Sequence, residues 1–191
     1  VVTANPLASK AGQQILAAGG SAVDAAIAVQ LMLSLVEPQS SGIGGGLFML
    51  HYDAASKKLQ TIDGRETAPK AAGPDWFMHQ GSLIPWQQAY VGGKAVGSPG
   101  VIKAMAFAHR KWGKLPWADL FQPAIQTAEQ GFIVSPRLAT LLKIYQDGAL
   151  SKFAASKAYF YPGDKPLPAG HLLKNPAYAA ILRKIATDGE A

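Results

Sequence analysis

The sequence contains no cysteine in its 191 residues. This absence excludes disulfide bonds, thiolate metal ligands and a cysteine nucleophile from the chain. Charged residues are also few, at 16%, whereas 49% of the residues are hydrophobic. A composition of this kind is typical of a folded globular protein and argues against a disordered chain.

The sequence also lacks an apolar run long enough to cross a bilayer. Its most apolar segment, residues 22–36, is interrupted by Asp24 and Gln30 and is shorter than the ~20 residues that a transmembrane helix needs. We interpret this segment as a buried helix and expect no membrane span. There is no signal peptide, and the chain opens at Val1 in what resembles the middle of a strand, so we expect a part of a longer protein.

The pattern of basic residues and histidines indicates neither a nucleic-acid site nor a metal site. The net charge of +6 is mild, and the lysines are scattered rather than gathered into a basic stripe interleaved with aromatics. The four histidines are far apart in the sequence, and none has the i, i+4 spacing of a helical zinc pair. We therefore expect no nucleic-acid partner and no bound metal.

Two familiar catalytic or cofactor motifs are approached but not matched. The glycine loop at 42–46 follows an expected helix and opens an expected strand, whereas a dinucleotide-binding loop follows a strand and opens a helix. The segment Gly97-Ser98-Pro99-Gly100 lacks the spacing of a G-x-S-x-G nucleophile elbow, and Ser98 is better explained as a helix cap. We expect no cofactor, and no Ser-His-Asp enzyme formed from this chain alone.

Capping residues followed directly by proline predict four helix starts, because the cap oxygen accepts a free N–H and proline at the first position loses none. The pairs are Asn5-Pro6, Ser98-Pro99, Ser135-Pro136 and Asn175-Pro176, and the expected helices cover 6–18, 99–112, 136–146 and 176–187. Ser21 and Asp24 form a capping-box pattern that begins a further helix, which Pro38 stops. Shorter helical segments are expected at 116–130, split by Pro123, and at 151–160.

A short antiparallel hairpin is expected from strands at 47–52 and 59–62, with the turn at 53–58. The Gly- and Pro-rich segment 68–99 is expected to be a long loop, which four aromatic residues pin to the body of the protein. These residues are Trp76, Phe77, Trp86 and Tyr90. The sequence therefore predicts an α+β protein that is mostly helical, with one short hairpin.

Arg65 lies just beyond the second expected strand, in the segment TIDGRETAP. On base rates, Arg65 and Glu66 form a salt bridge at a turn. Two features favour a binding role instead. Arginine is shaped to grip a carboxylate with two parallel N–H bonds, and a strand end beside a Gly-rich loop is a rigid place to present it. The residues alone leave both interpretations open.

Several stretches together resemble the γ-glutamyltranspeptidase family. They are AGQQILAAGGSAVDAAIA (11–28), VEPQSSGIGGGLFMLHYD (36–53), IDGRETAP (62–69), GGKAVGSPG (92–100), HRKWGKLPW (109–117), LFQPAIQTAEQGFIVSPRLA (120–139) and NPAYAAILRKIA (175–186). The likeness extends in order over nearly the whole chain. It is far more specific than any single motif.

This resemblance implies an N-terminal-nucleophile hydrolase with a four-layer αββα sandwich. Such a precursor cuts itself into a large and a small subunit, and a threonine at the start of the small subunit becomes the nucleophile, with its own α-amino group as base. The implied substrate is a γ-glutamyl compound such as glutathione. The glutamyl group passes through an acyl-enzyme to water or to an acceptor amine.

The matched stretches lie on the large-subunit side, so residues 1–191 are expected to be a single, incomplete domain. The chain contains no Thr-Thr pair of the kind that opens the small subunit, so the resemblance places the nucleophile beyond Ala191 and implies that this chain alone is inactive. Its one matching binding residue is Arg65, which grips the substrate α-carboxylate. The small subunit is the implied protein partner, and a periplasmic or secreted location is expected.

Two alternatives remain open at this point. Cephalosporin acylases, which act on glutaryl side chains, share the fold and most of these motifs. A non-catalytic remnant that binds γ-glutamyl compounds or a partner protein would also carry them.

Overall fold

The computed structural model describes residues 1–189, which divide into two compact units. One unit combines residues 1–43 with the residues from 105 onward, and the other consists of residues 44–104. The expected hairpin and Arg65 both belong to the second unit.

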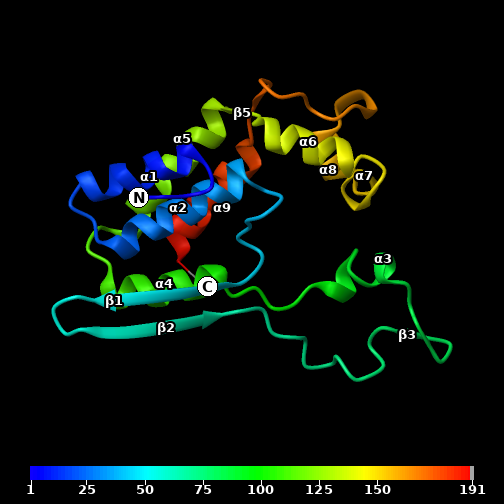
Figure 1. Ribbon diagram of the computed structural model, residues 1–191, viewed down its shortest axis with the longest axis horizontal. Helices are drawn as coiled ribbons and strands as arrows, with labels where there is room; N and C mark the ends of the chain where they lie inside the picture. The colour runs from blue at the N-terminus through cyan, green and yellow to red at the C-terminus, as the bar shows by residue number, and fades with distance from the viewer. Residues whose placement is uncertain (190–191) are drawn as a thin grey trace. The chain divides into compact units, whose positions relative to one another are not determined.

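The first unit is helical. It contains α1 (Pro6–Ala17), α2 (Ala22–Val36), the 3₁₀ helix η2 (Trp117–Phe121), α5 (Gln122–Gln130), β5 (Phe132–Ile133), α6 (Pro136–Ile144), α7 (Ala149–Lys152), α8 (Ala154–Phe160), the 3₁₀ helix η3 (Pro162–Asp164), β6 (Leu172–Leu173) and α9 (Pro176–Asp188). α2 packs against α1 and α5, and α5 packs against α9, as Figure 1 shows. Among the side chains that are fully buried are Ile27 and Leu31 on α2, Phe121 at the end of η2 and Leu182 on α9.

The second unit, residues 44–104, is built around the antiparallel hairpin. It contains β1 (Leu47–Asp53), β2 (Lys58–Gly64), β3 (Met78–His79), β4 (Ser82–Leu83), α3 (Trp86–Ala89), the 3₁₀ helix η1 (Gly93–Ala95) and the first turn of α4 (Val101–Trp112). β1 pairs with β2 in the register Leu47 opposite Gly64 and Asp53 opposite Lys58. The hairpin is therefore the one that the sequence predicts, and Arg65 directly follows its second strand.

Three of the four predicted cap-proline starts are confirmed. The side chains of Asn5, Ser135 and Asn175 each accept a backbone N–H bond at the start of α1, α6 and α9, over 2.9–3.1 Å. The fourth prediction is wrong, because α4 begins at Val101 rather than at Pro99. The Ser98 backbone instead donates to the Thr67 carbonyl at 2.9 Å, which holds Ser98 in an extended bridge.

Of the two shorter helical segments, 116–130 is split at Pro123 as predicted, whereas 151–160 is not the single helix expected. The segment at 116–130 opens as the 3₁₀ helix η2 and becomes α-helical at Gln122, where Pro123 is tolerated in the first turn. The segment at 151–160 is two helices, α7 and α8, because Phe153 between them adopts an extended conformation. Local capping signals therefore predicted the starts of α1, α2, α6 and α9, but not the start of α4 or the break at Phe153.

The prediction that four aromatic residues pin the 68–99 segment to the body of the protein does not hold for all four. Trp86 and Tyr90 are 73% and 50% exposed, and their rings contact each other one turn apart on α3. Trp76 is different, because its indole nitrogen donates to the Lys94 carbonyl at 2.8 Å. The expectation is therefore wrong for Trp86 and Tyr90, and the Trp76 bond joins two parts of the same segment instead of holding it to the body of the protein.

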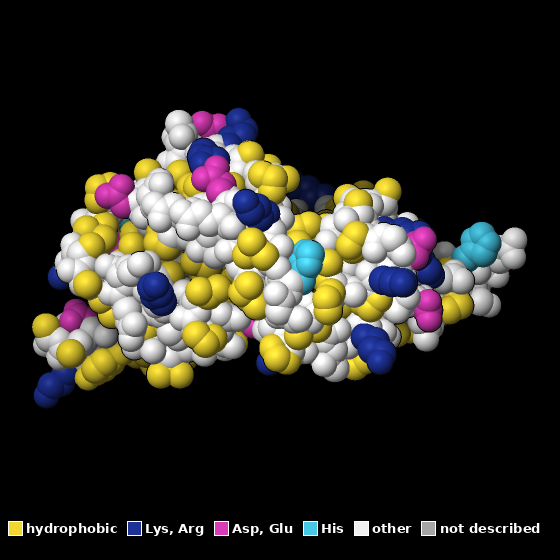
Figure 2. Space-filling model, turned by 90° about the horizontal axis from the view of Figure 1, so that it is seen from above, with side chains coloured by type: hydrophobic (Ala, Val, Ile, Leu, Met, Phe, Trp, Pro, Cys, Tyr) yellow, Lys and Arg dark blue, Asp and Glu magenta, His cyan; other side chains and the backbone are white. Residues whose placement is uncertain are grey.

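Within residues 1–189, none of the helices combines the length and the apolar character that crossing a membrane requires. Figure 2 shows the Lys and Arg side chains at separate points of the displayed face, among hydrophobic and uncharged side chains.

A buried carboxylate ties α2 to the connection after α4. Asp24 is fully buried, and its Oδ2 accepts N–H bonds from Ser21 (2.8 Å), Lys114 (2.9 Å) and Leu115 (3.1 Å). The Ser21 hydroxyl caps the Asp24 N–H in return, which confirms the predicted capping box. The other carboxylate oxygen of Asp24, Oδ1, lies 3.8 Å from His109 Nε2. One side chain therefore begins a helix and anchors a segment about 90 residues away.

Two opposing effects act on the pKa of Asp24. Burial raises it, but the backbone bonds from Ser21, Lys114 and Leu115 and the Ser21 hydroxyl together outweigh burial, so the pKa is lowered. A carboxyl whose folded-state pKa is lowered stabilises the fold above its unfolded pKa, and this contribution is lost as the pH falls through the folded value.

We expect Asp24→Ala to destabilise the fold by about 3 kcal/mol, because it removes a helix cap and leaves buried N–H groups unpaired. Thermal unfolding at neutral pH checks this, with Asp147→Ala in an exposed turn as the control. The difference between wild type and Asp24→Ala should shrink as the pH falls below about 4. If Asp24→Ala were as stable at neutral pH as the control Asp147→Ala, this role for Asp24 would be contradicted.

Candidate binding site at the end of strand β2

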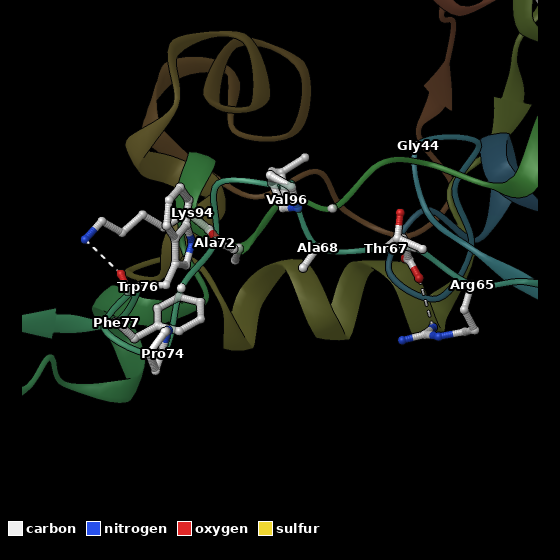
Figure 3. Close-up of a pocket in the computed structure, with 15 residues that line it drawn as sticks. Gly44, Arg65, Thr67, Ala68, Ala72, Pro74, Trp76, Phe77, Lys94 and Val96 are labelled. Atoms are coloured by element: carbon white, nitrogen blue, oxygen red, sulfur yellow. Dashed lines mark hydrogen bonds and ion pairs between the residues drawn. The ribbon is translucent and has the colours of Figure 1, made fainter.

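A pocket of about 670 Å³ lies within the 44–104 unit. It is lined by Gly44, Arg65, Glu66, Thr67, Ala68, Pro69, Ala72, Gly73, Pro74, Trp76, Phe77, Lys94, Ala95, Val96 and Gly97. Figure 3 shows Arg65 at one end and Trp76, Phe77 and Lys94 at the other. The residue singled out from the sequence therefore lines a cavity.

Arg65 is held at three points. Its backbone N–H donates to Asp63 Oδ1 at 3.0 Å, its Nη1 lies 3.2 Å from Glu66 Oε2, and its Cζ lies 6.0 Å from the centre of the Phe48 ring. The last distance is at the limit of a cation–π contact. The Arg65 side chain is 59% exposed, so its guanidinium remains accessible from the pocket.

Close backbone packing fixes the strand end from which Arg65 projects. The N–H groups of Gly100 and Val101 both donate to the Gly45 carbonyl, at 2.9 and 3.1 Å. A Cβ added at Gly100 would lie 2.2 Å from the Gly64 carbonyl oxygen, which is closer than a side chain can approach. Glycine at position 100 is therefore what lets the start of α4 lie against the end of β2.

The far end of the pocket is closed by two reciprocal hydrogen bonds. The Trp76 indole donates to the Lys94 carbonyl at 2.8 Å, and Lys94 Nζ donates to the Trp76 carbonyl at 3.1 Å. These bonds join residues 18 apart and bring an aromatic wall to the pocket. Sequence reasoning missed this pair, because a lysine and a tryptophan at that separation carry no local signal.

The lining residues can recognise a ligand, but no base is hydrogen-bonded to a nucleophile among them: Glu66 pairs with Arg65, and Lys94 Nζ donates to the Trp76 carbonyl. Thr67 is the hydroxyl residue of the set, and the described lining contains no histidine to activate it. Arg65 supplies a cation with a fork of N–H donors, suited to a carboxylate. Across residues 1–189, no cluster of three or more His, Asp or Glu side chains has the geometry to hold a metal ion.

The chain matches the protein-family model for γ-glutamyltranspeptidase over residues 8–191. It is 42% identical over 190 residues to the glutathione hydrolase proenzyme of Bacillus subtilis (strain 168), covering 99% of this chain and 32% of the relative. It is 41% identical over 196 residues to the acylase ACY 1 proenzyme of Pseudomonas sp. (strain SE83), covering 99% of this chain and 35% of that protein.

Among solved structures, the chain resembles γ-glutamyltranspeptidase of Helicobacter pylori with a TM-score of 0.93 and 34% sequence identity. The match covers 98% of this chain and 54% of that chain. The chain thus spans about one third of the length of each of these two curated relatives.

We expect Gly100→Ala to destabilise the 44–104 unit by about 1–3 kcal/mol, because the added methyl group meets backbone that cannot move aside cheaply. Hydrogen exchange at the amides of β1 and β2 measures the local effect. Gly93→Ala is the matched control, because a Cβ there meets nothing within 4 Å. Unchanged exchange in Gly100→Ala would contradict the packing argument.

Proposed function

The chain belongs to the γ-glutamyltranspeptidase family, and from that membership we propose that it is part of the large subunit of an enzyme that cleaves γ-glutamyl amides. The relatives named glutathione hydrolase and γ-glutamyltranspeptidase support this activity, and glutathione is the substrate we propose first. The proposal includes the finer fold: residues 1–191 form part of one four-layer αββα domain that the rest of the protein completes.

The proposed role of Arg65 is to bind the α-carboxylate of the glutamyl group. The observation that carries this role is a half-exposed guanidinium at one end of a cavity, on a strand end that glycine packing fixes. A guanidinium pairs with a carboxylate through two parallel N–H bonds, which orients the substrate as well as binding it. With the carboxylate held, the length of the glutamyl chain limits how far from Arg65 the γ-amide can lie.

The chemical step that we propose uses a threonine from the segment beyond Ala191. Its hydroxyl oxygen attacks the γ-amide carbon, the C–N bond breaks, and the leaving amine takes a proton. The acyl-enzyme ester is then attacked by water or by an acceptor amine, which restores the hydroxyl. In this scheme residues 1–191 supply recognition, and no cofactor takes part.

The proposed protein partner is the small subunit cut from the same precursor. One face of the hairpin supports it, because Phe48, Leu50, Tyr52 and Leu59 are all at least 60% exposed there. Alternate residues of a strand point to one side, so the three β1 residues share a face, and Leu59 lies opposite Tyr52. An apolar sheet face of this kind is typical of a surface that another layer covers.

A periplasmic or secreted location is part of the proposal, resting on the export of many bacterial members of this family. Cysteine-free composition is compatible with an oxidising compartment but does not select it.

A glutaryl acylase is the second candidate, favoured by the 41% identity to the Pseudomonas acylase proenzyme. A glutaryl amide differs from a γ-glutamyl amide by lacking the α-amino group and keeps the carboxylate. Arg65 would therefore serve both substrates. Comparing kcat/KM for γ-glutamyl and glutaryl anilides separates the two activities.

We expect Arg65→Ala in the full-length protein to raise KM for a γ-glutamyl anilide with a smaller effect on kcat. Loss of a charge-assisted pair costs about 2–4 kcal/mol when the pair is largely desolvated, which corresponds to roughly 30- to 1000-fold in affinity. Steady-state kinetics measures it. A normal KM in this variant would exclude the carboxylate role.

The matched control is a second substrate rather than a second variant. A 4-aminobutyryl anilide keeps the amine and the γ-amide but has no α-carboxylate. Wild type and Arg65→Ala should therefore handle it alike. An equal loss on both substrates would indicate a folding defect.

We also expect residues 1–191 alone to release no product from a γ-glutamyl anilide, because the pocket lacks an activated nucleophile. Addition of the following segment should give self-cleavage and restore turnover. Turnover by the isolated chain, measured against a buffer blank, would contradict the proposal that the nucleophile lies outside it.

A further inference from the structure

We propose that Glu66 is a positioning residue that holds one edge of the Arg65 guanidinium, so that the opposite edge stays open for the substrate carboxylate. A small Cβ-free surface formed by Gly45, Gly46 and Gly97, which we call the Glu66 seat, places the Glu66 side chain. The inference rests on the proposed role of Arg65 in substrate binding.

The Glu66 seat is defined by what a methyl group would strike at each glycine. A Cβ at Gly45 would lie 3.2 Å from Glu66 Oε1, and one at Gly46 would lie 2.5 Å from Oε2. A Cβ at Gly97 would lie 2.9 Å from Glu66 Cβ. Glycines at the three positions therefore leave the space that the Glu66 side chain occupies.

The Glu66 carboxylate depends on Arg65 for its charge partner. Oε2 is buried and accepts no hydrogen bond from the described residues, but it lies 3.2 Å from Arg65 Nη1. A buried carboxylate oxygen is costly unless a cation accompanies it. Because the seat fixes the carboxylate, the ion pair in turn fixes the guanidinium.

Among residues 1–189, this arrangement leaves one side of the Arg65 guanidinium without a partner. A guanidinium has five N–H donors, and pairing at Nη1 leaves the edge formed by Nε and Nη2 with two parallel N–H bonds. The Phe48 ring, 6.0 Å from Cζ, adds a further contact. Ordering the side chain before substrate arrives reduces the entropy lost on binding, so Glu66 raises affinity for a carboxylate without touching it.

Gly45 offers a selective test, because its added Cβ meets Glu66 Oε1 and nothing else within 4 Å. In the full-length protein we expect Glu66→Ala and Glu66→Gln to raise KM for a γ-glutamyl anilide about tenfold, with a smaller change in kcat. Gly45→Ala should raise it a few-fold by displacing the carboxylate. Gly45→Ala combined with Glu66→Ala should match Glu66→Ala alone, because the displaced group is gone. Gly42→Ala, where a Cβ meets nothing within 4 Å, is the matched control.

The same variants are assayed on the 4-aminobutyryl anilide, on which a positioning role predicts no effect. Equal losses on both substrates, or additive effects of the Gly45 and Glu66 changes, would overturn the inference. A normal KM in all Glu66 variants, with a raised KM in Arg65→Ala, would overturn it and leave the proposed function intact. A normal KM in Arg65→Ala would contradict both the carboxylate-binding role of Arg65 and the positioning role of Glu66. If the Glu66 variants fail to fold, the ratio of the Gly45→Ala effects on the two substrates decides the outcome.

Discussion

The geometry of the candidate site depends on backbone packing where β2 ends. The Gly100 and Val101 N–H groups share the Gly45 carbonyl, and a Cβ at Gly100 would come within 2.2 Å of Gly64 oxygen. Three chain segments therefore meet without side chains between them: the glycine loop, the strand end and the start of α4. Because Arg65 directly follows Gly64, the same packing restricts the position of the Arg65 Cα. A displacement of about 1 Å at such a position is enough to weaken a bidentate contact severely.

The two interpretations of Arg65 that the sequence left open are compatible in the structure. The salt bridge with Glu66 is present, at 3.2 Å, as base rates favoured. With the Arg65 side chain 59% exposed, the pair is screened by water and contributes little stability, so stability alone does not explain the residue. The geometry of the guanidinium explains it better. This planar group has five N–H donors, so it can pair with the Glu66 carboxylate and still offer an edge to a second carboxylate. In the role that we propose, the turn ion pair orients the guanidinium for a substrate carboxylate.

The parts of the fold that could be predicted are those that neighbouring residues determine. The capping box of Ser21 and Asp24 and the β1–β2 hairpin are local patterns, and both are confirmed. Ser98 was assigned wrongly because a partner 31 residues earlier, Thr67, captures its backbone N–H. The Trp76–Lys94 pair and the Glu66 seat were missed for the same reason. Each needs two segments brought together by the fold, and a glycine in sequence does not reveal which side chain it makes room for.

The exposure of Arg65 bears on the small subunit that we propose as partner. Arg65 is 59% exposed, so a carboxylate bound to residues 1–191 alone would remain largely solvated, and its pairing energy would be screened. The same guanidinium becomes a strong ligand only where water is excluded. The exposed hairpin face of Phe48, Leu50, Tyr52 and Leu59 starts one residue after β1 begins and includes the residue that contacts Arg65. A layer that covers this face would therefore desolvate Arg65 at the same time, so that one packing event would complete the core and strengthen recognition.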